Sequence, residues 1–99
     1  MRISIQPSAL SDPKEGYHFY EQQESGLGNY FIDTLYSDID SLQLYGGIHR
    51  TRFQRFHRLL SKRFPFAIYY EVIETDIFVR AILDLRRDST WILKRLKGL

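Results

Sequence analysis

Three titratable side chains on neighbouring segments could act together on a substrate. His57, Glu71 and Arg86 offer a base, an acid and a cation, and each falls on a segment with a strand-like pattern. If these segments form adjacent strands, the three side chains could converge on one open face of a sheet and carry out acid–base chemistry. The alternative is that His57, a lone histidine beside arginines, lies on a solvated strand.

Cationic side chains gather in the second half of the chain. Residues 1–45 carry two basic and seven acidic groups, a net charge of −5, whereas residues 46–99 carry twelve basic and five acidic groups, a net charge of +7. No acidic residue occurs from Gly46 to Tyr70. Such a basic half favours an anionic partner, either nucleic acid or an acidic protein segment, and the alternative is an ordinary solvated surface.

The stretch from Lys62 to Arg87 predicts two strands and the turn between them. Its side chains alternate with a period of two and one face is fully apolar, which is typical of a strand half-buried against a core. We expect the opposite face to stay open. The predicted apolar face comprises Phe64, Phe66, Ile68, Tyr70 and Val72 in the first strand, and Ile77, Val79, Ala81, Leu83 and Leu85 in the second.

The open face of this predicted hairpin carries two arginines, Arg80 and Arg86. Like charges on one strand face repel, so an anionic partner would reduce the electrostatic repulsion between the two arginines. The alternative is that Asp84, on the same face, or Glu71, across the ladder, already pairs with them. Tyr69 on this face could stack on a nucleic-acid base or pack beside its cross-strand neighbour.

Helical patterns occupy most of the first half of the chain. Residues 2–6 alternate as a short strand, and Asp12-Pro13 then predicts the start of a helix that Asp12 caps. A second helix is expected from about residue 29 to 45, because its apolar residues recur at spacings of three and four. The two helices form an antiparallel hairpin that can cover the apolar face of the sheet.

The remaining segments complete the order β-α-α-β-β-β-α. A strand is expected from roughly residue 53 to 60, and a short helix capped by Asp88 or Ser89 follows the last strand. Trp91 on this helix is expected to be a core anchor more than a contact residue. The prediction is a single α+β domain over residues 1–99, with a helical hairpin packed on a small antiparallel sheet.

Composition excludes several classes of site. The 99 residues contain no cysteine, so neither a disulfide framework nor a thiolate metal site is expected. His18 and His49 have no partner at ligand spacing, and we expect no metal and no cofactor. Since there is no apolar run near twenty residues and no signal-peptide pattern, we expect a cytoplasmic protein that does not enter a membrane.

The chain resembles the toxins of the RelE/ParE superfamily, the toxic halves of bacterial type II toxin–antitoxin pairs. The resemblance covers nearly the whole chain in order, and the Phe-Pro-Phe strand together with the closing Arg-Arg-Asp is its most specific part. The matching segments are Tyr20-Glu21, Gly26-Leu27-Gly28 with Phe31, Arg63 to Tyr70, and Ala81 to Asp88 with Trp91. The fold that the resemblance implies is a helical hairpin on a small antiparallel sheet.

The superfamily contains two activities, and the resemblance is closer to one of them. RelE-like members are ribosome-dependent endoribonucleases that cut mRNA, and ParE-like members poison DNA gyrase. Arg86 matches a phosphate-binding arginine of the ribonuclease pattern, but Ala67 stands in the strand that often carries a second arginine. Asp84 stands where a histidine is common, and no tyrosine follows Tyr70. The resemblance therefore favours the gyrase poison, with the ribonuclease and a non-toxic binding module as alternatives.

The resemblance also implies partners. A cognate antitoxin would hold the toxin inactive by wrapping a flexible acidic segment along the sheet and the helical hairpin, with its acidic groups meeting Arg58, Arg80 and Arg86. The target would be gyrase or, for a ribonuclease, the ribosome with its mRNA. Self-association through the surface meant for the antitoxin is a further expectation. The candidate antitoxin- or target-binding residues are Arg58, Tyr69, Arg80, Arg86, Arg87 and Trp91.

Overall fold

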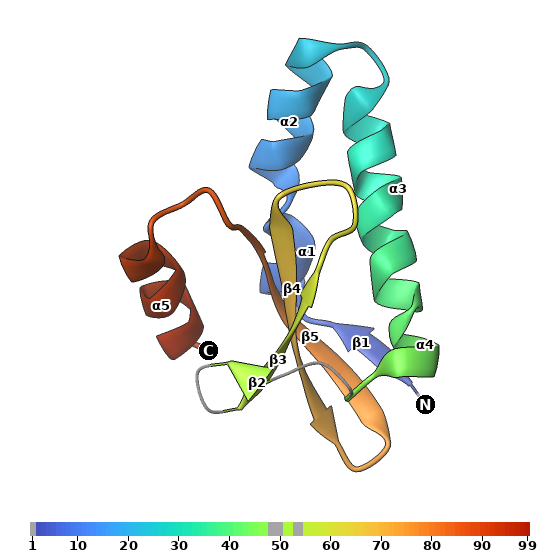
Figure 1. The fold of residues 1–99 in the computed structure, drawn as a ribbon, viewed down its shortest axis with the longest axis vertical. Coiled ribbons are helices and arrows are strands. Elements are labelled where there is room, and N and C mark those ends of the chain that lie inside the picture. Colours follow the sequence, from blue (N-terminus) through green and yellow to red (C-terminus); the bar gives the residue numbers. More distant parts are fainter. Residues whose placement is uncertain (1, 48–50, 53–54) are drawn as a thin grey trace.

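A computed structural model describes residues 2–47, 51–52 and 55–99 of the chain. One mixed sheet lies between a helical hairpin and a C-terminal helix (Figure 1). The helices are α1 (Pro7–Ser11), α2 (Lys14–Gln23), α3 (Leu27–Asp40), α4 (Leu42–Tyr45) and α5 (Ser89–Lys97). The strands are β1 (Ile3–Ile5), β2 (Thr51–Arg52), β3 (Phe56–Leu60), β4 (Phe66–Ile73) and β5 (Asp76–Asp84).

The sheet has the strand order β1-β5-β4-β3-β2. Strands β2 to β5 pair in antiparallel fashion, which confirms the predicted meander, and β1 adds to β5 in parallel. A tight turn forces neighbouring strands to run antiparallel, whereas β1 and β5 are separated by most of the chain and can pair in either direction. Of the strand predicted over residues 53–60, positions 53 and 54 lie outside the described residues.

A β-bulge in β5 overturns the predicted division of the hairpin into two faces. Tyr69 pairs with Ala81 and Tyr70 with Val79, so Arg80 has no position opposite it on β4. Because one extra residue reverses the alternation of every later side chain, Ile77 and Val79 point to one face while Ala81 and Leu83 point to the other. The expectation that these four residues share a face was therefore wrong.

Helices cover both faces of the sheet, and a separate hydrophobic core lies on each face. The hairpin of α2 and α3 packs on one side, which we call the hairpin face, with Phe31 and Leu35 against Ile68 and Val79. Helix α5 packs on the other side, the α5 face, where the core comprises Phe56, Ala67, Tyr69, Ala81, Leu83, Ile92 and Leu96. The face expected to be open is thus largely closed, because α5 has an apolar stripe that must itself be buried.

The helical hairpin is held at a close crossing by glycines and by one carboxylate. A Cβ atom added at Gly28 would lie 2.7 Å from the ring of Tyr17, and one added at Gly16 would lie 2.9 Å from Phe31. Glu21 accepts hydrogen bonds from the backbone N–H of Gly26, at 3.1 Å, and of Gly28, at 2.9 Å. Its charge therefore satisfies donors at the N-terminus of α3 from the end of α2.

Two helix predictions need correction at their ends. Asp12 does not cap α2, because Pro13 occupies that position and the Asp12 carboxylate bonds elsewhere. The helix expected to reach residue 45 ends at Asp40 and is followed by the separate turn of α4. Asp88 does cap α5, accepting from the N–H of Trp91 at 2.9 Å. Within the described ranges, no helix is long and apolar enough to cross a membrane.

Candidate functional site

Arg86 lies just after β5 and is bound by the carboxylate of Asp84 at the end of that strand. Arg86 Nε donates to Oδ1 at 3.0 Å and Nη2 donates to Oδ2 at 2.9 Å, while the Arg86 backbone N–H also donates to Oδ1 at 2.9 Å. Burial alone would raise the pKa of Asp84, but these hydrogen bonds outweigh it and hold that pKa below its ordinary value. Both oxygens of Asp84 thus occupy one edge of the Arg86 guanidinium.

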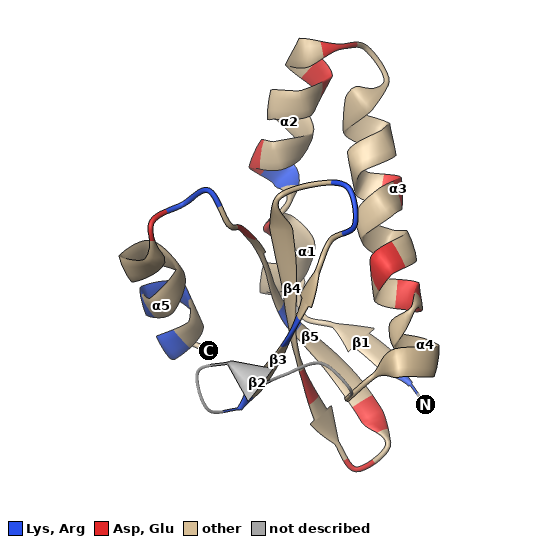
Figure 2. Ribbon diagram, viewed as in Figure 1, with Lys and Arg blue, Asp and Glu red and all other residues tan. Residues whose placement is uncertain are grey.

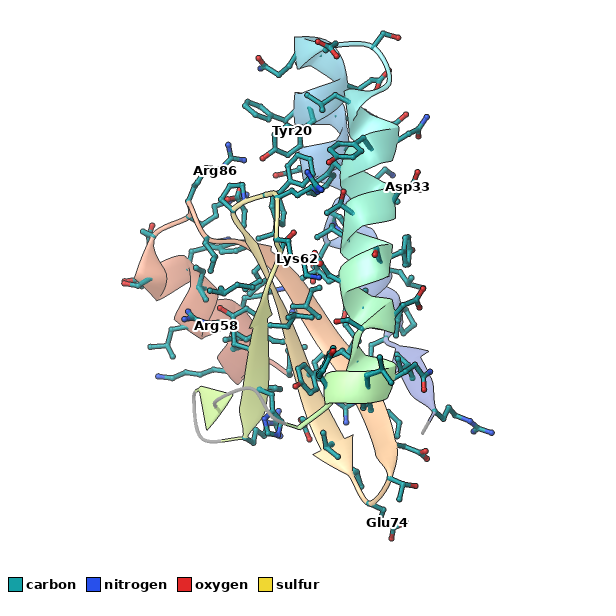
Figure 3. All side chains as sticks on the ribbon, turned by 45° about the vertical axis from the view of Figure 1, so that its right-hand side comes forward. Tyr20, Asp33, Arg58, Lys62, Glu74 and Arg86 are labelled. Carbon is teal, nitrogen blue, oxygen red and sulfur yellow. The ribbon has the colours of Figure 1, made fainter. Side chains whose placement is uncertain are left out.

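The same guanidinium lies over two aromatic rings of α2. It is 5.0 Å from the ring centre of Phe19 and 5.8 Å from that of Tyr20, and Figure 3 shows Tyr20 and Arg86 at the same end of the molecule. Burial raises the pKa of Tyr20 more than the charge of Arg86 lowers it. The Tyr20 hydroxyl therefore stays protonated at neutral pH, where it can donate a hydrogen bond but is a poor base.

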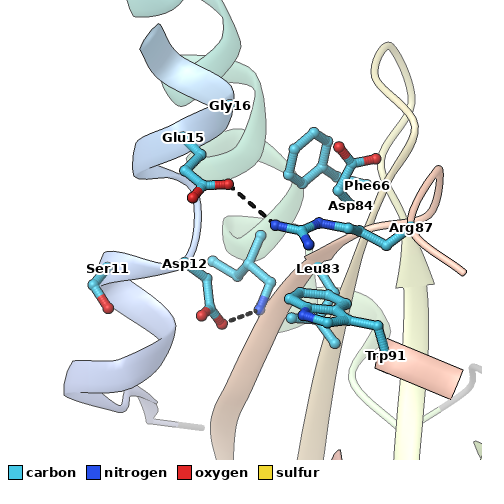
Figure 4. A pocket seen from close by; sticks show the side chains of 10 residues that line it. Ser11, Asp12, Glu15, Gly16, Phe66, Leu83, Asp84, Arg87 and Trp91 are labelled. Carbon is cyan, nitrogen blue, oxygen red and sulfur yellow. Dashed lines mark hydrogen bonds and ion pairs between the residues drawn. The ribbon is translucent and has the colours of Figure 1, made fainter. Parts of the chain in front are cut away.

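Arg87 contacts the first turn of α2 and Trp91 on α5. Its Nη2 lies 3.2 Å from Oε2 of Glu15, and its guanidinium lies 4.3 Å from the ring centre of Trp91 (Figure 4). Trp91 is partly buried beside the core under α5, as its predicted anchor role requires. A pocket of about 220 Å³ lies here, lined by Ser11, Asp12, Glu15, Gly16, Phe66, Ile82, Leu83, Asp84, Arg87 and Trp91.

Asp12 connects three elements around this pocket. Its Oδ2 accepts from the backbone N–H of Ile82 at 2.9 Å, and its Oδ1 lies 2.8 Å from Nη2 of Arg95 on α5. Strand β1 pairs with β5 only as far as Val79, so the carboxylate satisfies a strand donor beyond the end of β1. Sequence reasoning missed this role, because an aspartate before a proline is the ordinary signature of a helix start.

Glu71 is shared by two arginines on the α5 face. Its Oε1 lies 3.4 Å from Nε of Arg55 and 3.5 Å from Nε of Arg80, whose guanidinium also lies 5.0 Å from the ring centre of Phe78. The alternative considered for the sequence is therefore correct: Glu71 pairs with Arg80, and Asp84 pairs with Arg86. The expectation that Arg80 and Arg86 share a face was wrong, because Arg80 lies at the bulge and pairs with Glu71, whereas Arg86 lies over α2. The predicted repulsion between them does not arise, since they lie apart and each has its own carboxylate.

The candidate catalytic set of His57, Glu71 and Arg86 does not converge. His57 stacks on Tyr70, with ring centres 5.1 Å apart, on the hairpin face, whereas Glu71 follows Tyr70 along β4 and points to the α5 face. Arg86 lies beyond the opposite end of β4, since Asp84 pairs with Phe66. Glu71 lies five positions after Phe66 along β4, a length of roughly 16 Å.

Arg58 and Tyr69 face each other across β3 and β4 on the α5 side of the sheet. Tyr69 is only 1% exposed and belongs to the core under α5, so the expectation that it offers its ring to a nucleic-acid base needs correction. Tyr69 packs in the core because α5 covers the face that the sequence pattern predicted to be open. Arg58 is half-buried, and Figure 3 shows it on the side of β3 toward α5.

Charge is divided in space much as it is along the chain. Figure 2 shows acidic residues along α2 and α3, and basic residues on α5, on the loop between β3 and β4, and after β5. Among the described residues, no three histidine, aspartate or glutamate side chains gather as a metal site would require. Apolar side chains such as Leu10 and Leu44 are exposed, which is compatible with the predicted self-association but does not test it.

The fold has a counterpart among solved structures. One chain of a structure described as "Chromosomal ParDE TA system from P. aeruginosa" is similar to this chain with a TM-score of 0.77 and 16% sequence identity, over 86% of this chain and 96% of that chain. No family model matches the chain, and no curated protein matches its sequence. At such low identity the likeness concerns the fold. The chain therefore shares its fold with that chain of the ParDE structure.

Proposed function

We propose that this chain is the toxin of a type II toxin–antitoxin pair, that it inhibits growth by poisoning DNA gyrase, and that a cognate antitoxin neutralises it. The similarity in fold to a chain of a ParDE toxin–antitoxin system supports the toxin assignment. The choice of gyrase rests on the resemblance of the sequence to ParE-like members and on the state of the arginine that a ribonuclease would need.

The arrangement of Arg86, His57 and Glu71 supports the choice of a binding poison over a ribonuclease. Cleavage of RNA by its 2′-hydroxyl needs a base, an acid and a cation that is available to the phosphate. Here the two side-chain oxygens of Asp84 bind the Arg86 guanidinium, and His57 and Glu71 point to opposite faces of the sheet. This arrangement suits a surface that binds a protein better than one that moves protons.

The test uses the purified chain with DNA gyrase, ATP and supercoiled plasmid, scored for enzyme-linked double-strand breaks. Breaks that need both the chain and gyrase are the expected result. Lys94→Glu alters the exposed side of α5 without touching its buried residues, and Lys14→Glu is the matched single change on α2. If the basic side of α5 takes part in binding, the α5 variant reduces breaks more than the α2 variant does.

The absence of breaks, with folding verified by circular dichroism, would contradict the gyrase proposal. The next assay is then mRNA cleavage on translating ribosomes with the wild-type chain and Arg86→Ala. Cleavage that Arg86→Ala abolishes would identify a ribosome-dependent endoribonuclease. Harmless expression of the chain without any antitoxin, combined with no activity in either assay, would identify a non-toxic binding module.

A further inference from the structure

A second pocket lies between α5 and the sheet, and it differs in character from the acidic pocket around Asp12. It has a volume of about 240 Å³ and is lined by Arg58, Tyr69, Leu85, Ser89, Thr90, Ile92 and Leu93. Tyr69 and Ile92 are buried while Ser89 and Thr90 are exposed, so the pocket runs from the core under α5 to the surface. Its lining is mainly apolar, with one cation and two hydroxyl groups.

Arg58 is the unusual member of this lining. Arg55, Arg80, Arg86, Arg87 and Arg95 each lie within ion-pair distance of a carboxylate, but Arg58 has no such carboxylate among residues 2–47, 51–52 and 55–99. It is also half-buried, beside the fully buried Tyr69. A guanidinium that has lost part of its hydration without gaining a counter-charge favours an anion from outside.

The charges near the pocket favour the same kind of occupant. No acidic residue occurs between Gly46 and Tyr70, a stretch that includes β3. On α5, Lys94 follows the pocket residue Leu93. Asp88, the acid that begins α5, already accepts from the backbone N–H of Trp91. An acidic segment therefore meets attraction here, and a basic one meets repulsion.

The size of the pocket limits what enters it. At about 240 Å³ it lies below the range of about 300–1,000 Å³ that is typical of small-molecule sites. Its apolar lining, with a single cation, gives a phosphate chain little to bind. One apolar side chain with a carboxylate beside it fits both the lining and Arg58, in the way that a buried anchor residue organises a protein–protein contact.

We propose that this pocket is the anchor site for the antitoxin: an apolar side chain of an acidic, flexible segment enters between Tyr69 and Leu93, and a neighbouring carboxylate of that segment pairs with Arg58. The proposal rests on the proposed function for the identity of the partner. It assigns Arg58 a positioning and specificity role at the rim, and it assigns Tyr69 the role of a buried wall.

The test is a titration of the full-length, ¹⁵N-labelled chain with synthetic peptides, followed by NMR. The probe is an acetylated glycine–serine peptide that carries one leucine flanked by glutamates. One matched peptide replaces the leucine with serine, and a second replaces the glutamates with glutamines. The expected result is that the leucine–glutamate peptide shifts the amide signals of Tyr69, Thr90 and Leu93, and that both matched peptides bind more weakly.

Two variants separate the pocket from general charge attraction. Arg58→Gln should weaken binding of the leucine–glutamate peptide by roughly fivefold, the worth of one partly exposed charge pair, and should leave the glutamine peptide unchanged. Arg63→Gln removes the same charge from the loop between β3 and β4, outside the pocket, and should have a smaller effect. Thr90→Phe, at an exposed position, should fill the pocket and abolish the shifts.

Three outcomes would overturn the proposal: no shift at the pocket with millimolar peptide, equal binding by wild type and Arg58→Gln, or displacement of the peptide by single-stranded oligouridine that itself binds through Arg58. The last outcome would make the pocket an RNA contact. Gyrase cleavage is measured separately with wild-type chain, so the pocket and the proposed toxin function can fail independently of each other.

Discussion

Asp84 and Arg86 form a two-point ion pair, with their side-chain atoms 3.0 and 2.9 Å apart, although only one residue separates them in the chain. Asp84 is the last residue of β5, and Arg86, for which the sequence resemblance predicted phosphate binding, follows the strand. Because the Asp84 carboxylate occupies one edge of the Arg86 guanidinium, Asp84 would compete with any phosphate that binds Arg86. The pair with Asp84 raises the pKa of Arg86, but it reduces the net positive charge that Arg86 presents to outside partners.

Removing the charge of Asp84 should make Arg86 available to anions. Asp84→Asn keeps the size of the side chain and removes the counter-charge, so affinity for single-stranded RNA at low salt should rise several-fold. Fluorescence anisotropy with a labelled oligonucleotide measures the change. The double variant Asp84→Asn with Arg86→Gln is the control, and it should return to wild-type affinity. Equal binding by wild type and Asp84→Asn would show that Asp84 does not restrain Arg86.

The same pair gives stability a defined pH dependence. The pKa of Asp84 in the folded chain is lowered from the ordinary value of 3.8, so its contribution to stability is present above that value and is lost as pH falls through the folded pKa. The pair is partly exposed, which limits the effect to about 1 kcal/mol or less. Urea unfolding at neutral and acid pH should show wild type losing more stability than Asp84→Asn. A constant difference at all pH values would contradict this.

The close crossing of α2 and α3 should tolerate no side chain at Gly28. A Cβ atom there would lie 2.7 Å from the Tyr17 ring and 2.9 Å from the Tyr17 carbonyl oxygen, which belongs to the backbone and cannot move aside. We expect Gly28→Ala to lower the free energy of unfolding by about 1–3 kcal/mol. Gly98→Ala is the matched control, since its nearest contact would be an ordinary 3.6 Å. Thermal unfolding measures the stability of both variants. Similar melting temperatures for Gly28→Ala and Gly98→Ala would contradict the requirement for glycine at position 28.

Asp12 should hold the last strand and α5 together. Asp12→Ala removes the acceptor for the Ile82 N–H and the partner of Arg95, so it should cost about 1–3 kcal/mol of stability. The Ile82 amide should also exchange its hydrogen faster. Glu15→Ala is the control, because the Glu15 side chain is 88% exposed and its pair with Arg87 contributes little. Unchanged Ile82 exchange in Asp12→Ala would contradict this role.

Local patterns were enough to predict most of the elements. The alternation in β4 and β5, the periodic apolar residues of α3 and the Asp88 cap of α5 all depend on residues a few positions apart, where backbone geometry dictates which side chains share a face. The sequence therefore predicted a helical hairpin on a sheet with an antiparallel meander, and the structure confirms it. The pairing of Arg80 and Arg86 with Glu71 or Asp84 was only the alternative that the sequence left open, and the structure shows that this alternative is the correct one.

What only the tertiary structure decided involves contacts between distant segments. The bulge at Arg80 reverses the later side chains of β5, and no residue type marks it in advance, since it arises from the register between two strands. Helix α5 buries Tyr69. The Asp12 carboxylate accepts a hydrogen bond from the backbone N–H of Ile82, which is 70 positions away in the chain. His57, Glu71 and Arg86 are separated for the same reason: a strand pattern indicates that side chains alternate, but pairing and packing decide which end and which face each one occupies.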